Sequence, residues 1–195
     1  ASKLVEKNNE VIILSLDDPE ENSFYEISPN IKRIFLFKKN RLKYYNFLEN
    51  IKLIFSIRKK IFILKPKIVI SFLPPMYVIN ILALINLNIP HIGCEHLVFR
   101  HYLTSPLKSL LIFFAPLFLD SFVCVSEQAL KSFPKLTKKK FAYINNPINI
   151  KSILKADILN KNTKEKTILS IGRLEKQKNY IILIKAFSLL TKKYP

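Results

Sequence analysis

The sequence predicts an α/β protein built on a doubly wound parallel sheet. Short runs of β-branched and aromatic residues, typical of buried strands, alternate along the chain with segments whose apolar residues recur at helical spacing. The composition is globular, with 49% apolar and 24% charged residues among 195. Two cysteines do not make a disulfide scaffold, and we expect Cys94 and Cys124 to be core residues.

The first half of the chain divides into seven expected elements. Runs rich in Ile, Val and Phe mark the strands. Apolar residues at helical spacing, including Leu48, Ile51 and Phe55, mark the longest helix. The elements are the last turns of a helix at 1–8, strands at 10–16 and 31–37, a helix at 44–64, a strand at 68–73, a helix at 76–86 and a strand at 89–94.

Residues 68–94 contain no Asp, Glu, Lys or Arg, so a transmembrane helix is an alternative interpretation of this segment. Pro74 and Pro75 interrupt it near the start, and three asparagines add a polar cost. We therefore favour two buried strands with a helix between them. Because no signal peptide opens the sequence, we expect a cytoplasmic protein.

The second half continues the same alternation. Ser126 precedes a helical segment as its expected N-cap, and Pro147 follows two asparagines in a turn. The elements are a helix at 106–117, strands at 121–126 and 141–144 with a helix at 127–133 between them, a strand at 167–171 and a helix at 179–193. The last helix has one apolar face, formed by Ile182, Leu183, Ala186, Phe187 and Leu190.

The net charge is +18, and it is unevenly distributed. Residues 1–30 carry −5, residues 31–67 carry +11 and residues 135–195 carry +12. Such surfaces attract nucleic acid, anionic lipid or phosphorylated small molecules, although 27 lysines against 5 arginines also indicate a compositional bias. We expect no nucleic acid partner, because arginine is scarce and no DNA- or RNA-binding motif is present; a basic nucleic-acid-binding protein is the less favoured alternative.

The segment that follows the predicted strand at 167–171 contains candidate chemistry. The strand ends at Gly172, and a loop bearing Arg173 and Lys178 leads into the last helix. At the carboxyl end of a parallel strand, beside a helix N-terminus, a glycine and two cations are typical of a phosphate site. The alternative is a surface turn in a lysine-rich protein.

Residues 172–179 read Gly-Arg-Leu-Glu-Lys-Gln-Lys-Asn, and they resemble the GRLxxxKN segment of retaining GT-B glycosyltransferases of family 4. Residues 89–96, Ile-Pro-His-Ile-Gly-Cys-Glu-His, resemble the strand end of bacterial members that build surface polysaccharide. The opening helix and strand, the strand near 69–73 and the stretches 123–126 and 144–148 agree with the same family in the same order. The resemblance covers nearly the whole chain.

This resemblance implies two Rossmann-like domains with a cleft between them and no obligatory metal or cofactor. Residues 1–150 would form the N-terminal, acceptor-side domain, residues 151–166 a Lys- and Asn-rich linker, and residues 167–195 the first strand-helix unit of the C-terminal domain. That second domain would bind the donor, a nucleotide-diphosphate sugar. The acceptor would be a lipid-linked or surface polysaccharide.

The resemblance also implies roles for five residues. Gly172, Arg173 and Lys178 match positions that hold the donor diphosphate, where two positive charges would stabilise the departing phosphate. His96 matches the cleft histidine near the transferred sugar, and Glu95 precedes it, so both are catalytic candidates. The alternative for His96 is a satisfied polar residue at a strand end.

The sequence also departs from the family pattern. The opening strand and glycine-rich loop are not found before Ala1, nor most of the second domain after Pro195. We therefore expect the polypeptide alone to lack transferase activity, and a non-catalytic remnant or accessory binding subunit is an alternative. His91 and His101 match nothing in the family, and we expect them to be structural or exposed.

The basic block at 38–67 has aromatic residues interleaved with its cations. If the acceptor is lipid-linked, we expect this block to dock on anionic lipid at the inner face of the cytoplasmic membrane. A solvated helix face is the equally weighted alternative. The docking residues would be Lys38, Lys39, Arg41, Lys43, Arg58, Lys59 and Lys60.

Overall fold

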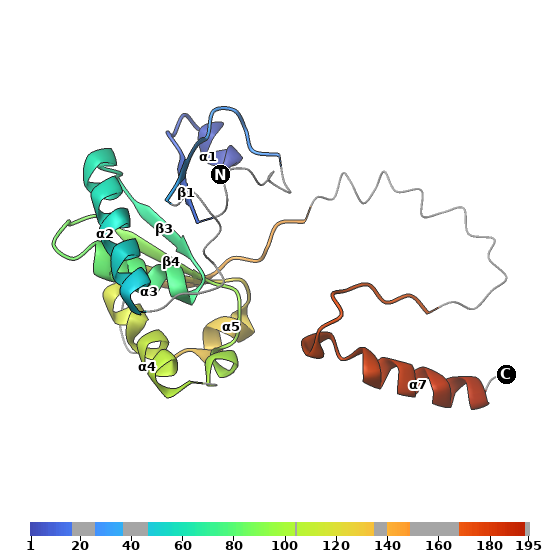
Figure 1. Cartoon of the computed structure of the whole chain (residues 1–195). Coiled ribbons are helices and arrows are strands. Elements are labelled where there is room, and N and C mark those ends of the chain that lie inside the picture. Colours follow the sequence, from blue (N-terminus) through green and yellow to red (C-terminus); the bar gives the residue numbers. More distant parts are fainter. Residues whose placement is uncertain (17–25, 37–46, 104, 135–139, 149–167, 194–195) are drawn as a thin grey trace. The chain divides into compact units, whose positions relative to one another are not determined.

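The structure is a computed structural model that describes residues 1–16, 26–36, 47–103, 105–134, 140–148 and 168–193 (Figure 1). The chain divides into two compact units, Ala1–Pro147 and Ile148–Pro195, and each is described by itself. All the strands found in the described ranges belong to the first unit.

Two parallel sheets form the framework of the first unit, which confirms the predicted α/β class. β1 pairs with β2, and the other strands pair in the order β3-β4-β5-β6, every pair being parallel. Each strand overlaps a β-branched or aromatic run assigned from the sequence. The strands are β1 (Ile12–Ser15), β2 (Lys32–Phe35), β3 (Val69–Phe72), β4 (His91–Glu95), β5 (Ser121–Cys124) and β6 (Lys140–Tyr143).

Helices connect these strands. The α-helices are α1 (Ser2–Val5), α2 (Phe47–Leu64), α3 (Pro74–Ala83), α4 (Pro106–Phe114) and α5 (Glu127–Ser132), and the 3-10 helices are η1 (Phe99–Tyr102) and η2 (Ala115–Phe118). The helix expected at 106–117 is therefore divided, because it tightens into 3-10 geometry at Ala115, just before Pro116. α3 begins two residues earlier than expected, since prolines are tolerated in a first turn.

The segment at 68–94 contains β3, α3 and most of β4, which confirms the interpretation as two strands and a helix over a single transmembrane helix. Within the described ranges, no helix combines the length and the apolar composition that crossing a membrane requires. The expected N-cap of α5 is also confirmed, because Ser126 Oγ accepts a hydrogen bond from the amide of Ala129 at 3.1 Å.

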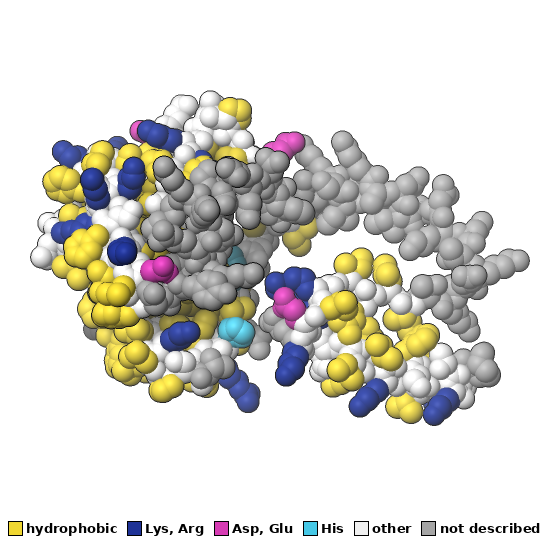
Figure 2. Space-filling model, in the orientation of Figure 1, with side chains coloured by type: hydrophobic (Ala, Val, Ile, Leu, Met, Phe, Trp, Pro, Cys, Tyr) yellow, Lys and Arg dark blue, Asp and Glu magenta, His cyan; other side chains and the backbone are white. Residues whose placement is uncertain are grey.

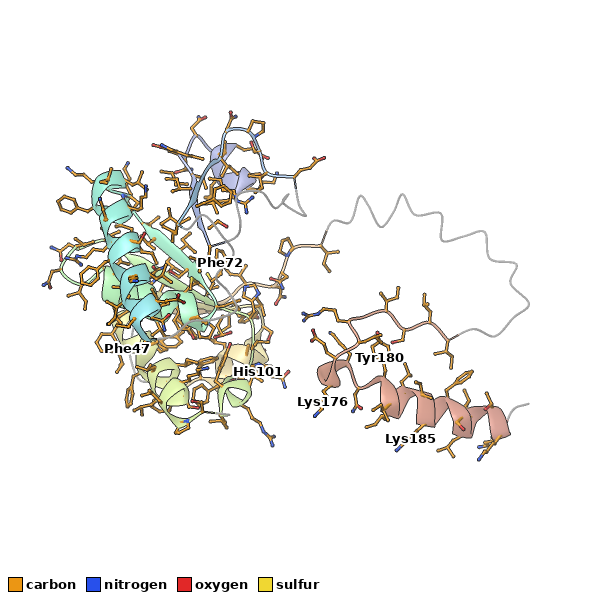
Figure 3. All side chains as sticks on the ribbon, in the orientation of Figure 1. Phe47, Phe72, His101, Lys176, Tyr180 and Lys185 are labelled. Carbon is orange, nitrogen blue, oxygen red and sulfur yellow. The ribbon has the colours of Figure 1, made fainter. Side chains whose placement is uncertain are left out.

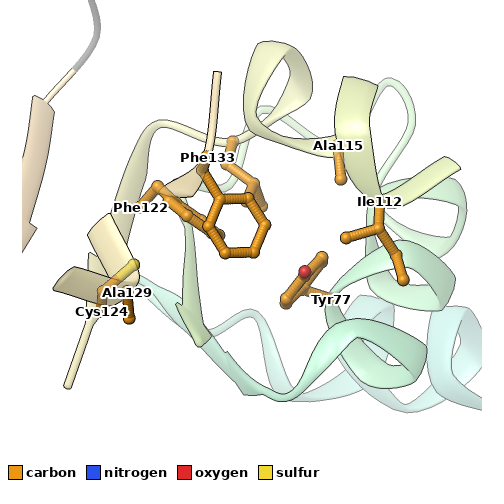
Figure 4. Close-up of a cluster of buried hydrophobic side chains, with 8 residues drawn as sticks. Tyr77, Ile112, Ala115, Phe122, Cys124, Ala129 and Phe133 are labelled. Atoms are coloured by element: carbon orange, nitrogen blue, oxygen red, sulfur yellow. The ribbon is translucent and has the colours of Figure 1, made fainter. Parts of the chain in front are cut away.

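The buried apolar residues form two clusters. The first joins α3, α4, η2 and β5 to α5 and contains Tyr77, Ile112, Ala115, Leu119, Phe122, Cys124, Ala129 and Phe133 (Figure 4). The second joins α2 and α3 to the end of β1 and contains Leu16, Leu53, Ile57, Ile61, Ile79, Ala83 and Leu84. The expectation that Cys124 is a core residue is therefore confirmed, whereas Cys94 is half-buried and, like Cys124, free.

The face of α2 that enters the core does not contain Leu48 and Phe55, two of the residues whose spacing marked this helix in the sequence. Leu53, Ile57 and Ile61 are buried, whereas Leu48 and Phe55 are each 66% exposed. α2 has two apolar stripes, and the hydrophobic spacing alone does not say which one meets the sheet. This helix therefore presents large apolar side chains to the outside of the protein.

The second unit contains the 3-10 helix η3 (Lys176–Lys178) and the helix α7 (Tyr180–Lys193). The expectation of a strand at 167–171 is wrong for residues 168–171, which are not hydrogen-bonded to any strand. A strand is stable only when its amides and carbonyls pair with a neighbour, and no other strand lies in the described part of this unit. The apolar face of α7 is accordingly not buried.

Candidate functional site

The carboxyl ends of β3, β4, β5 and β6 meet at one edge of the four-stranded sheet because all four strands are parallel. In open α/β sheets this edge is where ligands bind. Three main-chain hydrogen bonds continue the ladder there. They run from the amide of Leu73 to the carbonyl of Cys94 at 2.9 Å, from Val125 to Glu95 at 3.1 Å and from Ile144 to Cys124 at 2.8 Å. His96 is the first residue beyond β4 at this edge.

Glu95 ends β4 and is completely buried, yet no cation pairs with it in the described residues. Four donors face its carboxylate instead. Oε1 accepts from the amides of His96 at 2.7 Å and Leu97 at 2.9 Å and from the Tyr102 hydroxyl at 2.8 Å, while Oε2 accepts from the Tyr77 hydroxyl at 3.0 Å. The carboxylate thus ties together β4, α3 and the chain that leads into η1.

The surroundings keep these donors protonated. Burial, reinforced by the Glu95 carboxylate, raises the pKa of Tyr77 and of Tyr102 well above the ordinary phenol value. Burial and then Glu95 raise the pKa of the Cys124 thiol to about 12. Glu95 therefore holds the main chain of His96 in place, and its own carboxylate is shielded from solvent.

The side chain of His96, in contrast, is exposed. Its ring meets the edge of the Phe72 ring, with centroids 6.2 Å apart and planes at 76°. Leu73 follows Phe72 at the end of β3, and it has φ 70° and ψ 152°, a conformation almost restricted to glycine. Strained backbone of this kind is concentrated at functional sites, which marks the surroundings of His96 as the candidate site in the first unit.

His91 lies at the amino end of β4, opposite to His96. Of the two expectations for it, structural or exposed, the structure confirms the first. It is 3% exposed, its Nε2 lies 2.7 Å from Ser71 Oγ, and Ser71 Oγ accepts from Asn80 at 2.6 Å. Burial lowers the pKa of His91 to about 4, against the opposing effect of Asp120, which accepts from the His91 amide. His101 is exposed.

The second unit brings Gly172, Arg173 and Lys178 together in the turn before α7. A Cβ at Gly172 would lie 2.8 Å from the Tyr180 hydroxyl and 3.6 Å from Lys178 Cδ, so this glycine makes room for both side chains. Arg173 Nη1 lies 3.1 Å from Glu175 Oε1, and Arg173 remains largely exposed. An exposed guanidinium and ammonium on one short turn can bind phosphate oxygens.

The cations expected to dock on lipid have different surroundings. Arg58 Nη1 donates to the carbonyls of Ala83 at 2.9 Å and Ile85 at 2.7 Å, which gives it a structural role in joining α2 to the end of α3. Lys59 is exposed and Lys60 is half-buried. The other four lie outside the described residues: Lys38, Lys39, Arg41 and Lys43.

Sequence reasoning missed the tyrosines that build these sites. Tyr77 and Tyr102 reach Glu95 from 18 and 7 residues away. Tyr180, which Figure 3 labels, packs on Gly172. The one available signal was an acidic residue at the end of an apolar strand, which requires donors when no cation is near. In the part of the chain that the structure describes, no group of three His, Cys, Asp or Glu side chains is arranged to hold a metal ion.

The chain is similar to known proteins over most of its first unit. The model of a family described as Glycosyltransferase Family 4 matches residues 1–152. A protein of Haemophilus influenzae described as an uncharacterized glycosyltransferase is 38% identical over 117 residues. That match covers 58% of this chain and 31% of the relative, so it spans about a third of the relative's length.

Proposed function

This chain belongs to glycosyltransferase family 4, and we propose that it takes part in transferring a sugar from a nucleotide-diphosphate donor to a lipid-linked or surface glycan acceptor, with retention of configuration. The observation that carries the proposal is the exposed His96 at the carboxyl edge of the sheet, with its main chain held by Glu95. A ligand at this edge would meet the imidazole of His96 and the ring of Phe72.

In this proposal the second unit binds the donor. Gly172, Arg173 and Lys178 would hold the diphosphate, and the two cations would stabilise the negative charge that develops on the leaving phosphate. Their exposure and their closeness to Gly172 support this role. His96 would contact the sugar that is transferred, and Glu95 would keep His96 in position.

We assign residues 1–150 to an acceptor-side domain, residues 151–166 to a linker, and residues 167–195 to the donor-binding domain. The division into Ala1–Pro147 and Ile148–Pro195 supports this assignment. We also propose a cytoplasmic location with peripheral attachment to anionic lipid through the basic block around α2.

Nucleotide binding tests the donor role. The purified chain is titrated with uridine and guanosine diphosphates, and binding is followed by ligand-observed NMR. We expect saturable binding that weakens about tenfold on Arg173→Ala and on Lys178→Ala, because each removes one charge-assisted contact. Lys185→Ala is the matched control, since Lys185 is an exposed lysine on α7 (Figure 3). Equal effects of all three substitutions, or no saturable binding, would contradict the donor role.

Sugar transfer by a protein that includes residues 1–195 tests His96. We expect His96→Ala to lower kcat at least about tenfold, with the KM for the donor nearly unchanged, because the imidazole would act on the transferred sugar and not on the diphosphate. His101→Ala is the control, since His101 is also exposed. An unchanged kcat in His96→Ala would refute the assignment.

A further inference from the structure

The first unit has a hollow at the amino edge of the four-stranded sheet, opposite to the edge that holds His96. Its volume is about 550 Å³, which is within the usual range for small-molecule sites. The end of α3, the turn that follows it, η2 and the starts of β4 and β5 surround it. The apolar part of its wall is formed by Ile81, Leu84, Ile85, Ile89 and Phe118.

His91 lines this hollow and has one unpaired polar atom. The residue is 3% exposed, and its Nε2 lies 2.7 Å from Ser71 Oγ. Its Nδ1 is buried, and in the part of the chain that the structure describes it has no hydrogen-bond partner. Buried polar atoms are nearly always paired, so an unpaired nitrogen beside a hollow indicates a partner that enters the hollow.

The hydrogen-bond pattern places the ring proton of His91 on Nδ1. The ring is neutral, because burial lowers its pKa to about 4, and it therefore carries one N–H. Ser71 Oγ accepts from Asn80 Nδ2 at 2.6 Å, and among the described residues the Ser71 hydroxyl has His91 Nε2 as its one acceptor. Because the hydroxyl donates to Nε2, the Nδ1–H group is the unpaired donor, and it needs an acceptor.

Asp120 adds a carboxylate beside this donor. Its Oδ2 accepts from the His91 amide at 2.8 Å, and the residue is exposed and lines the hollow. Within the described ranges Asp120 forms no ion pair. Carboxylates are scarce in this protein, which has 32 basic and 14 acidic residues, and Figure 2 shows few magenta side chains among the dark-blue ones. A free carboxylate here therefore distinguishes the hollow from the basic surface around it.

The two polar groups together favour a hydroxyl. A ligand carboxylate accepts from Nδ1–H, but Asp120 repels it. An ammonium group pairs with Asp120, but it has no acceptor for Nδ1–H. A hydroxyl accepts through its oxygen and donates its proton, so it satisfies both groups. The apolar wall then favours rings over a polar body, because covering that wall removes apolar surface from water.

We propose that this hollow binds a small uncharged molecule in which an apolar ring system carries a hydroxyl group. The hydroxyl accepts from His91 Nδ1 and donates to Asp120, and the rings cover the apolar wall. Because the hollow lies at the opposite edge of the sheet from His96, it is a second ligand site, and it does not depend on the proposed function.

The imidazole signals of the wild-type chain test the proposal. The chain has three histidines, so heteronuclear NMR spectra of the rings resolve each one, with His91→Gln for assignment. We expect the His91 proton on Nδ1 and a saturable movement of its signal on titration with 2-naphthol, while the exposed His96 and His101 stay in place. A ring proton on Nε2, an unmoved His91 signal or equal movement of all three histidines would overturn the proposal.

A charged analogue with the same rings, 2-naphthoate, tests the role of Asp120. Measured at the His91 signal, 2-naphthol should bind at least about tenfold more tightly than 2-naphthoate. In Asp120→Asn this preference should fall at least about tenfold, because the amide still accepts from the His91 amide but no longer repels a carboxylate.

Glu127→Gln is the matched control, since Glu127 is an exposed acidic residue outside the hollow, and it should keep the wild-type preference. Equal affinities of the two probes in wild type would overturn the proposal. So would an unchanged preference in Asp120→Asn, or an equal change in Glu127→Gln.

Discussion

Replacing Glu95 by alanine is expected to remove a large part of the stability of the first unit. Four hydrogen-bond donors converge on its buried carboxylate, and two of them are main-chain amides that have no other acceptor after the strand ends. An unsatisfied buried donor costs about 1–3 kcal/mol. Because Tyr102 is only half-buried and water can reach some of these groups, we expect a total of about 4 kcal/mol rather than the full sum.

Glu95→Gln should cost less, about 1–2 kcal/mol. The glutamine carbonyl can still accept from the two amides, and its NH2 group can donate to a rotated Tyr77 hydroxyl. What is lost is the charge that strengthens each bond, partly offset by the lower cost of burying a neutral group. We therefore expect Glu95→Ala to be the least stable, Glu95→Gln to be intermediate and wild type to be the most stable.

Urea denaturation followed by circular dichroism measures these differences. Glu127→Ala serves as the control, because Glu127 is exposed and pairs with Lys131 on the surface of α5, where little change in stability is expected. Tyr77→Phe should destabilise wild type more than it destabilises Glu95→Gln. In wild type the substitution removes a hydrogen bond to a carboxylate, whereas in Glu95→Gln the Tyr77 hydroxyl faces only a neutral amide. Equal stabilities of the alanine and glutamine variants, or a cost below about 1 kcal/mol for alanine, would refute the network as described.

Three further predictions concern the same sheet. Burial lowers the pKa of His91 from 6.5 to about 4 in the folded state, so as pH falls the unfolded state binds a proton before the folded state does. The free energy of unfolding should therefore drop by up to about 3 kcal/mol between pH 6.5 and 4. Urea denaturation at several pH values measures the drop, and its absence in a His91→Gln variant would confirm that His91 is its origin. Gly93→Ala should destabilise by about 1–3 kcal/mol, because its Cβ would lie 2.5 Å from Cδ1 of the fully buried Leu119; a neutral effect on the melting temperature would contradict this. Leu73→Gly should stabilise by about 1 kcal/mol in urea, because glycine adopts φ 70° without strain, and a loss of stability would show that the strain is absent.

The order of strands and helices was predictable from the sequence because each element has its own local signal. Short runs with β-branched or aromatic residues overlap β1 to β6, and Ser126 marks the start of α5 through a side-chain hydrogen bond to the amide three residues on. The failure at residues 168–171 has a different origin. A strand needs a partner, and the local composition of an apolar run contains no information about whether a neighbouring strand lies beside it.

The site was predictable only in part, and for a related reason. Glu95 and His96 are adjacent in the sequence, so the pair is visible there, and the resemblance placed it at a strand end. The burial of Glu95 beside the exposed His96 depends on Tyr77 and Tyr102, which come from other elements and look like ordinary apolar-helix or loop residues in the sequence. Only the folded chain shows that the Glu95 carboxylate is buried while the neighbouring His96 imidazole is exposed.

α2 shows the same limit of local sequence patterns. Its two apolar stripes are equally regular in the sequence, and the spacing of Leu48, Ile51 and Phe55 marked the helix without saying which stripe faces the core. In the structure Leu53 and Ile57 fill the core, so the regularity of the outward stripe is not required for packing.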